Sequence, residues 1–339
     1  MKTAVFAYTR SGILTARKVL ALFENEDRRS FVPERFREEG FRPIPKSSRA
    51  FYGEQFSWAD AMIFVGACGI AVRAVAPHIR DKRTDPAVIC VDDMGKYVIP
   101  VLSGHIGGAN DLAKKLAEAL DAEAVITTAT DIHCRFSVDS WAKQQGLTIG
   151  NMQRAKEISA AILEQDIPLY SEFPVGSAYP AGIYPAENGP IGIYIGWIKK
   201  DPFTKTLRLI PRNLHIGIAC RRGTAAETIR CAVNTVLDEY KIDPRAVRTI
   251  SSIDLKADEA GLAEYAAAEN IPLTFFSAGE LRAVPGCWHH SDFVEQVTGV
   301  DNVCERAAMI RSDCLIVPRT IFNGVTVAVG AEIPEVKFE

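Results

Sequence analysis

A serine, a histidine and three glycines lie together where an apolar segment gives way to a helical pattern. The stretch VIPVLSGHIGGANDLAKKLAEAL places Ser103, Gly104, His105, Gly107 and Gly108 at this junction. Glycine lets a ligand approach the backbone closely, and the first N–H groups of a helix lack partners within the helix. The helix dipole adds partial positive charge there. The junction therefore predicts a site for a phosphate or a carboxylate.

Proton transfer is the second chemistry that this junction offers. His105 is a candidate general base near neutral pH, or else a loop histidine that only hydrogen-bonds a ligand or a carbonyl. Asp92, Asp93 and Asp131 each follow a predicted strand. They are candidates to orient His105 or to act as bases, although aspartates in such positions also cap helices and turns. We expect Asn110 to cap the helix that follows.

Similar glycine junctions recur along the chain as YTRSG, GACGI and CRRGT. Tight turns between strand and helix explain any one of them. Together they favour a ligand with several anionic groups, because arginines lie in or near the junctions. The candidate binding residues are Arg73, Arg221, Arg222, Gly223 and Thr224. We expect these loops at the carboxyl ends of parallel strands, where ligands bind in open sheets.

Two charged loops offer further contacts, and each has a plain alternative. Lys82 and Arg83 in DKRTDP either reach carboxylates in the pocket or belong to a solvated turn. Asp254 and Lys256 in SSIDLKADE either face a cleft or pair with each other.

Other site types lack their motifs. The chain has no G-x-x-x-x-G-K-[ST] loop, no G-x-G-x-x-G fingerprint in GACGIAVRA, and no G-x-S-x-G elbow around VLSGH. The pairs His133-Cys134 and His289-His290 are adjacent residues, whose side chains rarely converge on one ion. We expect no metal site, and structural or surface roles for these four residues.

Alternating strands and helices must position these loops. Predicted strands include Thr3–Thr9, Ala61–Ala67, Pro86–Asp92, Tyr97–Leu102 and Ala124–Asp131. Amphipathic helical patterns fall between most of them, which predicts an α/β fold with mainly parallel sheets and helices on both faces. We expect α/β domains at 1–135 and 213–339, joined by a smaller irregular α+β region at 136–212, where GPIGIYIGWI and KTLRLIP pair as strands.

Composition excludes several classes of protein. The 339 residues carry a formal net charge of −3, which favours neither nucleic acid nor an acidic membrane as a partner. No apolar run approaches the roughly 20 residues that span a bilayer. The 8 cysteines form no C-x-x-C pair, so we expect buried thiols in a cytoplasmic protein.

Long ordered segments then resemble one family. GACGIAVRAVAPHIRDKRTDPAVICVDDMGKYVIPVLSGHIGGANDLAKKLA is similar to the N-terminal core of the CbiG family of cobalamin biosynthesis, the cobalt-precorrin-5A hydrolases. GIACRRGT, SSIDLKADEAGL, FFSAGEL, VTGVDNVCERAA and GVTVAVG resemble that family's C-terminal domain. The resemblance covers about residues 1–135 and 213–339, and the segment between them is compatible with the family's variable linker.

This resemblance implies an enzyme of the anaerobic, early-cobalt route to vitamin B12. Its substrate is a cobalt-bearing tetrapyrrole, whose ring A δ-lactone is opened by water with release of acetaldehyde. The substrate carries the cobalt, and no separate cofactor is implied. Other corrin-pathway enzymes become candidate partners for handover, and a homo-oligomer stays open.

Roles on this substrate are hypotheses from the residues. His105 activates water or takes the hydroxyl proton, with Asp131 or Asp93 in reserve, and the amides of Gly107 and Gly108 stabilise the oxyanion. Two other classes stay open. One is a tetrapyrrole carrier without catalysis, and the other is a flavodoxin-like or nucleotide-binding protein, which the strand–TRSG–helix start favours.

Overall fold

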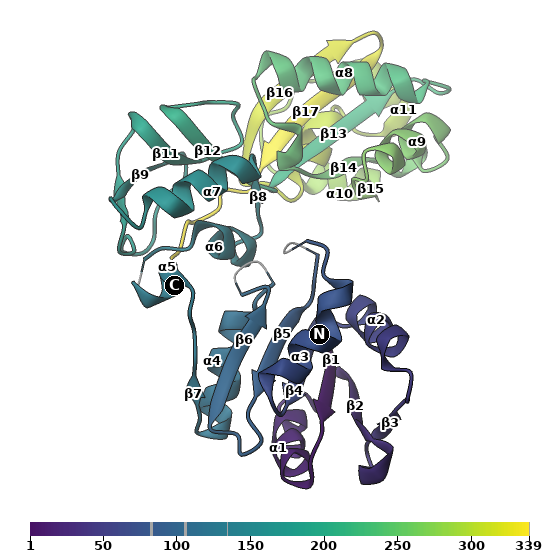
Figure 1. Ribbon diagram of the computed structural model, residues 1–339. Helices are drawn as coiled ribbons and strands as arrows, with labels where there is room; N and C mark the ends of the chain where they lie inside the picture. The colour runs from purple at the N-terminus through teal and green to yellow at the C-terminus, as the bar shows by residue number, and fades with distance from the viewer. Residues whose placement is uncertain (82–83, 105–106, 134, 339) are drawn as a thin grey trace. The chain divides into compact units, whose positions relative to one another are not determined.

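The computed structural model describes residues 1–81, 84–104, 107–133 and 135–338, and of residues 130 and 131 the backbone alone. The chain divides into two compact units, Met1–Ser140 and Trp141–Glu339. Within the described residues the first unit holds one sheet and the second holds two (Figure 1). The expected division into three domains stays a prediction.

The first sheet has the order β3-β2-β1-β4-β5-β6-β7. Strands β1 to β5 run parallel, β6 is antiparallel to β5, and β7 is parallel to β6. The strands are β1 Lys2–Ala7, β2 Asp27–Pro33, β3 Arg42–Ile44, β4 Ala61–Val65, β5 Ala87–Val91, β6 Tyr97–Leu102 and β7 Glu123–Ala124.

Helices cover both faces of this sheet. Helices α1 and α4 pack on one face with Val5 and Ile63, and α2 and α3 pack on the other with Phe6 and Phe64. Adjacent residues face opposite sides because side chains alternate along a strand. The helices are α1 Arg10–Ala21, α2 Ser48–Trp58, α3 Cys68–Val75, α4 Ala109–Leu120, α5 Ala129–Ile132 and α6 Val138–Gln144, with 3-10 turns η1 Glu34–Phe36 and η2 Ala76–His78.

The direction of β6 corrects one expectation. β5 and β6 are joined by a short turn, which connects antiparallel strands, whereas parallel strands need a long crossover. Leu102 therefore pairs with Val88 at the start of β5. The loop after β6 lies at the opposite edge of the sheet from the loops after β1 and β4, so the expectation of one shared carboxyl edge is wrong for SGHIGG.

The predicted strand Ala124–Asp131 is also wrong over most of its length. Only Glu123–Ala124 forms β7, and α5 begins at Ala129. β7 pairs with the first two residues of β6 only. One further bond, from the amide of Val125 to the carbonyl of Val98 at 2.8 Å, follows the paired residues.

The second sheet lies in the second unit and has the order β10-β9-β11-β12-β8. Strands β9 to β12 are parallel, and β8 is antiparallel to β12. The expected pairing of GPIGIYIGWI with KTLRLIP is confirmed as β11 against β12. The elements are β8 Leu147–Ile149, α7 Met152–Ala161, β9 Ile167–Ser171, β10 Ile183–Pro185, β11 Gly189–Ile195 and β12 Phe203–Pro211.

The third sheet has the order β15-β14-β13-β17-β16. Strands β13, β14 and β15 are parallel, β17 is antiparallel to β13, and the expected hairpin forms between β16 and β17. The strands are β13 Leu214–Cys220, β14 Val247–Ile253, β15 Leu273–Phe276, β16 Cys314–Phe322 and β17 Val325–Ala331.

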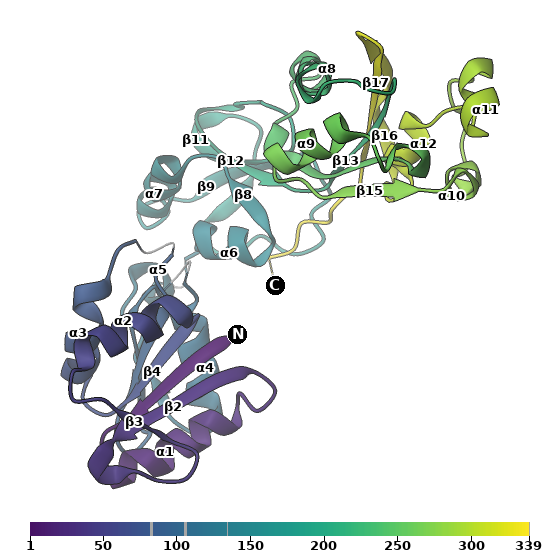
Figure 2. The ribbon, with the colours of Figure 1, turned by 90° about the vertical axis from the view of Figure 1, so that its right-hand side faces the viewer.

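Figure 2 shows α8 and α9 on one face of this sheet and α10 and α12 on the other. The helices are α8 Ala226–Glu239, α9 Ala260–Ala268, α10 Ala278–Ala283, α11 Asp292–Thr298 and α12 Cys304–Met309, with 3-10 turns η3 Pro244–Ala246 and η4 Asp254–Lys256. The predicted α/β class, with mostly parallel sheets covered by helices, is confirmed.

Candidate functional site

The loop between β6 and α4, here called the glycine loop (residues 103–108), is held tightly at its described positions. Ser103 has a left-handed φ of 59°, and its hydroxyl donates to the carbonyl of Asp85 at 3.1 Å. A Cβ atom on Gly107 would overlap the side chain of Ser103. Glycine at 107 is therefore required by close packing, whether or not a ligand approaches it.

The start of α4 is partly closed by this loop. The amides of Ala109 and Asn110 donate to the carbonyls of Ser103 and Gly104 at 3.1 and 3.0 Å. The expectation of open amides is therefore wrong for these two groups. The amides of Gly107 and Gly108 remain the proposed donors to an anion at this junction.

Asn110 is not the helix cap. Gly108 occupies the N-cap position with a left-handed φ of 81°, which glycine adopts without strain. Asn110 is buried, and its side-chain amide donates to Thr128 Oγ1 at 2.8 Å. This bond ties the start of α4 to the segment before α5, the helix that carries Asp131. Asn110 thus braces the helix start against that segment.

Several candidate residues lie outside the described part of the chain. These are Lys82, Arg83 and His105, together with the side chain of Asp131. Described neighbours link these segments: the Ser103–Asp85 bond joins the glycine loop to the loop before β5, and the Asn110–Thr128 bond joins the start of α4 to the segment before α5. The chemistry proposed for these residues stays a prediction.

Asp93 lies at the other edge, just after β5. Its carboxylate accepts a hydrogen bond from the hydroxyl of Thr9, the residue that caps α1, and its carbonyl accepts one from Thr15 at 3.0 Å. The five residues of β5 separate it from the glycine loop by roughly 16 Å. The structure therefore does not bring Asp93 to the glycine loop, and its role as a reserve base stays a prediction.

The neighbouring Asp92 serves the β5–β6 turn. Its carboxylate accepts from the amides of Met94, Lys96 and Tyr97 at 3.0, 2.6 and 2.6 Å. Arg73 lies exposed in the last turn of α3, and its guanidinium reaches back along the helix to within 3.8 Å of where a Cβ atom on Gly69 would lie.

The carboxyl edge of the third sheet does bring predicted residues together. Arg222 in the loop after β13 pairs with Asp258 at 3.0 Å, beside the η4 turn that holds Asp254 and Lys256. This guanidinium lowers the pKa of Asp258. Lys256 pairs with the buried Glu259 at 3.3 Å, so the alternative of an Asp254–Lys256 pair is wrong.

This edge also shows what its loop amides bind. The amide of Gly223, which has a left-handed φ of 74°, donates to Glu259 Oε1 at 2.8 Å. The hydroxyl of Thr224 is turned inward to the carbonyl of Arg221 at 2.7 Å. The Gly223 amide binds a carboxylate, as expected of a glycine junction, but this carboxylate belongs to Glu259 of the same chain. Among the described residues Arg221 makes no ion pair, which leaves its charge available to an anionic ligand.

A cavity of about 710 Å³ opens within the second unit, between its two sheets. Trp141, Arg212, Arg248 and Glu332 are among its lining residues. Glu332 pairs with Arg248 at 2.7 Å and with the buried ring of His215 at 3.2 Å. Burial lowers the pKa of His215 in spite of this carboxylate. No sequence pattern marks this cavity, because its lining comes from segments far apart in the chain.

The arrangement of the described residues also bears on metal binding and on membrane insertion. No group of three or more His, Cys, Asp or Glu side chains in the described ranges is arranged to hold a metal ion. In the same ranges, no helix is both long enough and apolar enough to cross a bilayer.

Comparison with known proteins accounts for most of the chain. A family model described as Cobalamin synthesis G N-terminal matches residues 50–131, and one described as Cobalamin synthesis G C-terminus matches residues 214–330. Cobalt-precorrin-5A hydrolase of Salmonella typhimurium is 32% identical, over 96% of this chain and 97% of the relative. The protein of the same name from Priestia megaterium is 31% identical, over 96% of this chain and 94% of the relative.

A solved structure also aligns along the chain. It is described as a putative cobalamin biosynthesis protein G homolog from Sulfolobus solfataricus, with 21% identity, a TM-score of 0.41 and 97% of each chain covered. The matched ranges and the near full-length identity settle the family. The chain belongs to the cobalamin synthesis G (CbiG) family.

Proposed function

We propose that this protein is a cobalt-precorrin-5A hydrolase, which opens the ring A δ-lactone of its cobalt-bearing substrate and releases acetaldehyde to give cobalt-precorrin-5B. One observation carries the proposal: the similarity to proteins named as this hydrolase extends over 96% of the chain. A match of that length takes in all three sheets, so it concerns the whole protein and not one shared domain. We further propose that the reaction takes place in the cytoplasm, with other corrin-pathway enzymes as handover partners.

The reaction requires two proton transfers from oxygen. Water adds to the lactone carbonyl, the acyl–oxygen bond breaks, and the ring A acetate and a hydroxyl group result. The hydroxyl then loses its proton and becomes the carbonyl of acetaldehyde, while the carbon–carbon bond breaks and its electrons return to the macrocycle, which takes up a proton. A base serves each deprotonation, and hydrogen-bond donors stabilise the oxyanion of the first step.

Roles in this chemistry are proposed for each unit separately. The amides of Gly107 and Gly108 would serve the oxyanion, with His105 as a base in the same loop and Asp131 in reserve. Arg221 would hold an acetate or propionate arm, since a guanidinium matches carboxylate geometry. The remaining candidate residues of the two loop clusters would position the macrocycle. The cobalt arrives with the substrate, and no resident cofactor is proposed.

Oxygen labelling tests the hydrolytic step. Conversion of cobalt-precorrin-5A in H₂¹⁸O, without air, should place one heavy oxygen in a carboxylate of the tetrapyrrole product, because water attacks the acyl carbon. Mass spectrometry of the product shows the label. A product without the label contradicts attack at the lactone carbonyl. Tight binding of the substrate without any conversion would instead establish the carrier function.

A further inference from the structure

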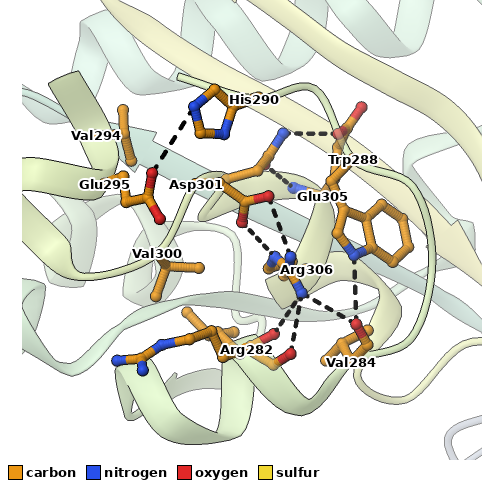
Figure 3. A network of polar contacts seen from close by, with 12 residues as sticks. Arg282, Val284, Trp288, His290, Val294, Glu295, Val300, Asp301, Glu305 and Arg306 are labelled. Carbon is orange, nitrogen blue, oxygen red and sulfur yellow. Dashed lines mark hydrogen bonds and ion pairs between the residues drawn. The ribbon is translucent and has the colours of Figure 1, made fainter. Parts of the chain in front are cut away.

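Residues 284–302, here called the histidine loop, are pinned by one arginine. The guanidinium of Arg306 donates to the carbonyls of Leu281, Arg282 and Val284 at 3.2, 3.2 and 3.0 Å. It also pairs with Asp301 through two contacts of 2.7 and 3.1 Å (Figure 3). The two ends of the loop are thereby fastened to α12.

A buried carboxylate fixes the middle of the loop. Glu305 is 1% exposed, and its oxygens accept from the backbone amide of His289 at 2.9 Å, from Asn302 Nδ2 at 2.6 Å and from the amide of Arg319 at 2.8 Å. The Arg319 amide lies in a register shift of β16 between Val317 and Thr320. Bulges of this kind release a backbone group from the ladder and redirect it.

The fourth donor to this carboxylate is an imidazole. Nδ1 of His289 lies 2.7 Å from Glu305 Oε1. Burial acts to raise the pKa of Glu305, but the amides of Arg319 and His289 outweigh it, so the pKa lies below its ordinary value. An ionised carboxylate only accepts hydrogen bonds, so Nδ1 of His289 must carry the proton. In the neutral ring Nε2 is then left as the proton acceptor.

The outer side of the ring faces solvent. The side chain of His289 is 63% exposed, and within the described ranges no residue hydrogen-bonds to its Nε2. A rigid buried carboxylate behind an accessible imidazole is the arrangement in which histidine acts as a general base. A ring needed only for packing has no reason to present its second nitrogen outward.

The adjacent histidine provides a contrast. His290 is also exposed, but it lies 2.8 Å from the exposed carboxylate of Asp292. It also lies 3.7 Å from that of Glu295 (Figure 3). A hydrogen bond to Asp292 raises the pKa of His290, which favours its charged form. The two neighbours therefore differ in the one property that proton transfer requires, a fixed tautomer with a free acceptor nitrogen.

The dyad lies on the same half of the third sheet as Arg221. The histidine loop and α12 pack on Ile253 and Phe276, the last residues of β14 and β15, and on Ala219 near the end of β13. Arg221 follows β13 at that edge.

We propose that His289 is a proton-transfer residue and that Glu305 is its positioning residue. This inference rests on the proposed function and adds a base in the C-terminal half to the one expected in the glycine loop. Nε2 takes a proton from an oxygen of the reacting system, either the attacking water or the hydroxyl left by lactone opening. It returns that proton to the departing alkoxide in the first case and to the macrocycle in the second.

The variant His289→Asn separates chemistry from structure. The Asn amide keeps a donor near the position of Nδ1, so the bond to Glu305 and the loop are retained, while the base Nε2 is removed. We expect turnover of cobalt-precorrin-5A to fall about 100-fold to 10,000-fold with an unchanged melting temperature. His290→Asn is the matched control and should keep wild-type turnover. Imidazole added to His289→Ala should restore part of the activity.

Two results would overturn the proposal. One is wild-type turnover in His289→Asn, and the other is an equal loss in His290→Asn. A measurement without substrate separates this proposal from the proposed function. ¹⁵N NMR of the wild-type protein should show the Nδ1–H tautomer at His289. The Glu305→Gln variant should lose its preference for this tautomer. An Nε2–H tautomer in the wild type rejects the dyad even if the enzyme is active. An inactive wild type with the Nδ1–H form rejects the hydrolase assignment instead.

Discussion

At the scale of single residues, one buried ion pair ties the second sheet to the third. Asp243 has a side chain only 5% exposed and binds Arg245 through contacts of 2.9 and 2.7 Å. Arg245 also donates to the carbonyl of Gly150 before α7, at 3.1 Å. Burial alone would raise the pKa of Asp243, but the Arg245 guanidinium and amide outweigh it and the pKa is lowered.

A lowered pKa fixes how stability depends on pH. The stabilisation is present above the carboxyl's ordinary pKa and is lost as the pH falls through the lowered value. We expect Asp243→Asn to reduce the free energy of unfolding by about 1–2 kcal/mol near neutral pH, a modest value because Arg245 is half-exposed. Urea unfolding should show this difference shrinking below about pH 4.

The matched control is Asp238→Asn. Asp238 pairs with Lys199 at 2.8 Å but is 71% exposed, so its loss should change stability by no more than about 0.5 kcal/mol. Equal effects of the two variants would contradict the importance of burial at Asp243.

The sequence shows which residue types occupy the loop junctions, but not which groups their backbone amides bind. Glycines at 107 and 223 are visible in the sequence. The partner of each amide is not visible: Glu259 takes the amide of Gly223, and Asn110 turns from the helix start to Thr128. His289 looks like half of a surface pair in the sequence, since Glu305 is 16 residues away along the chain.

At the scale of elements, α12 lies directly on β13. A Cβ atom on Gly217 would overlap the carbonyl of Cys304 and lie 2.7 Å from the amide nitrogen of Ala308. We expect Gly217→Ala to force the helix away from the sheet and to cost about 1–3 kcal/mol in thermal or urea unfolding. Because α12 carries Glu305, turnover should fall as well.

A second glycine, in a helix packed on the same sheet, is the control for replacing glycine by alanine. Gly279 in α10 has ordinary φ, and an added Cβ would meet only Ser277 Oγ, at 3.9 Å. Gly279→Ala should be neutral or stabilising by up to about 1 kcal/mol, because alanine favours a helix. Destabilisation of both variants to the same extent would mean that close approach at Gly217 is not the cause.

Element types follow from local patterns, whereas element directions do not. Alternation of strand and helix predicts the α/β class, and the β16–β17 hairpin is visible in its turn. The antiparallel course of β6 follows from the short turn after β5, a local signal that outweighs the general expectation of parallel strands. That one reversal moves the glycine loop to the other edge of the sheet and separates it from Asp93.

At the scale of the whole molecule, the chain end returns to the second sheet. Val336 bridges to Val175, and the indole of Trp141 donates to the carbonyl of Lys337 at 2.8 Å across 196 residues of sequence. A single sequence gives no signal for contacts between residues so far apart along the chain. The family, in contrast, is evident from ordered motifs at both ends of the chain, which local physics alone does not supply.

The central claim is that the whole chain catalyses one reaction on cobalt-precorrin-5A. The most direct measurement is acetaldehyde released in a single turnover, with enzyme in excess over substrate and without air. The account predicts one equivalent of acetaldehyde for each tetrapyrrole converted, because the two-carbon fragment leaves once. Conversion of the macrocycle without acetaldehyde, or no conversion by folded protein that binds the substrate, would contradict it.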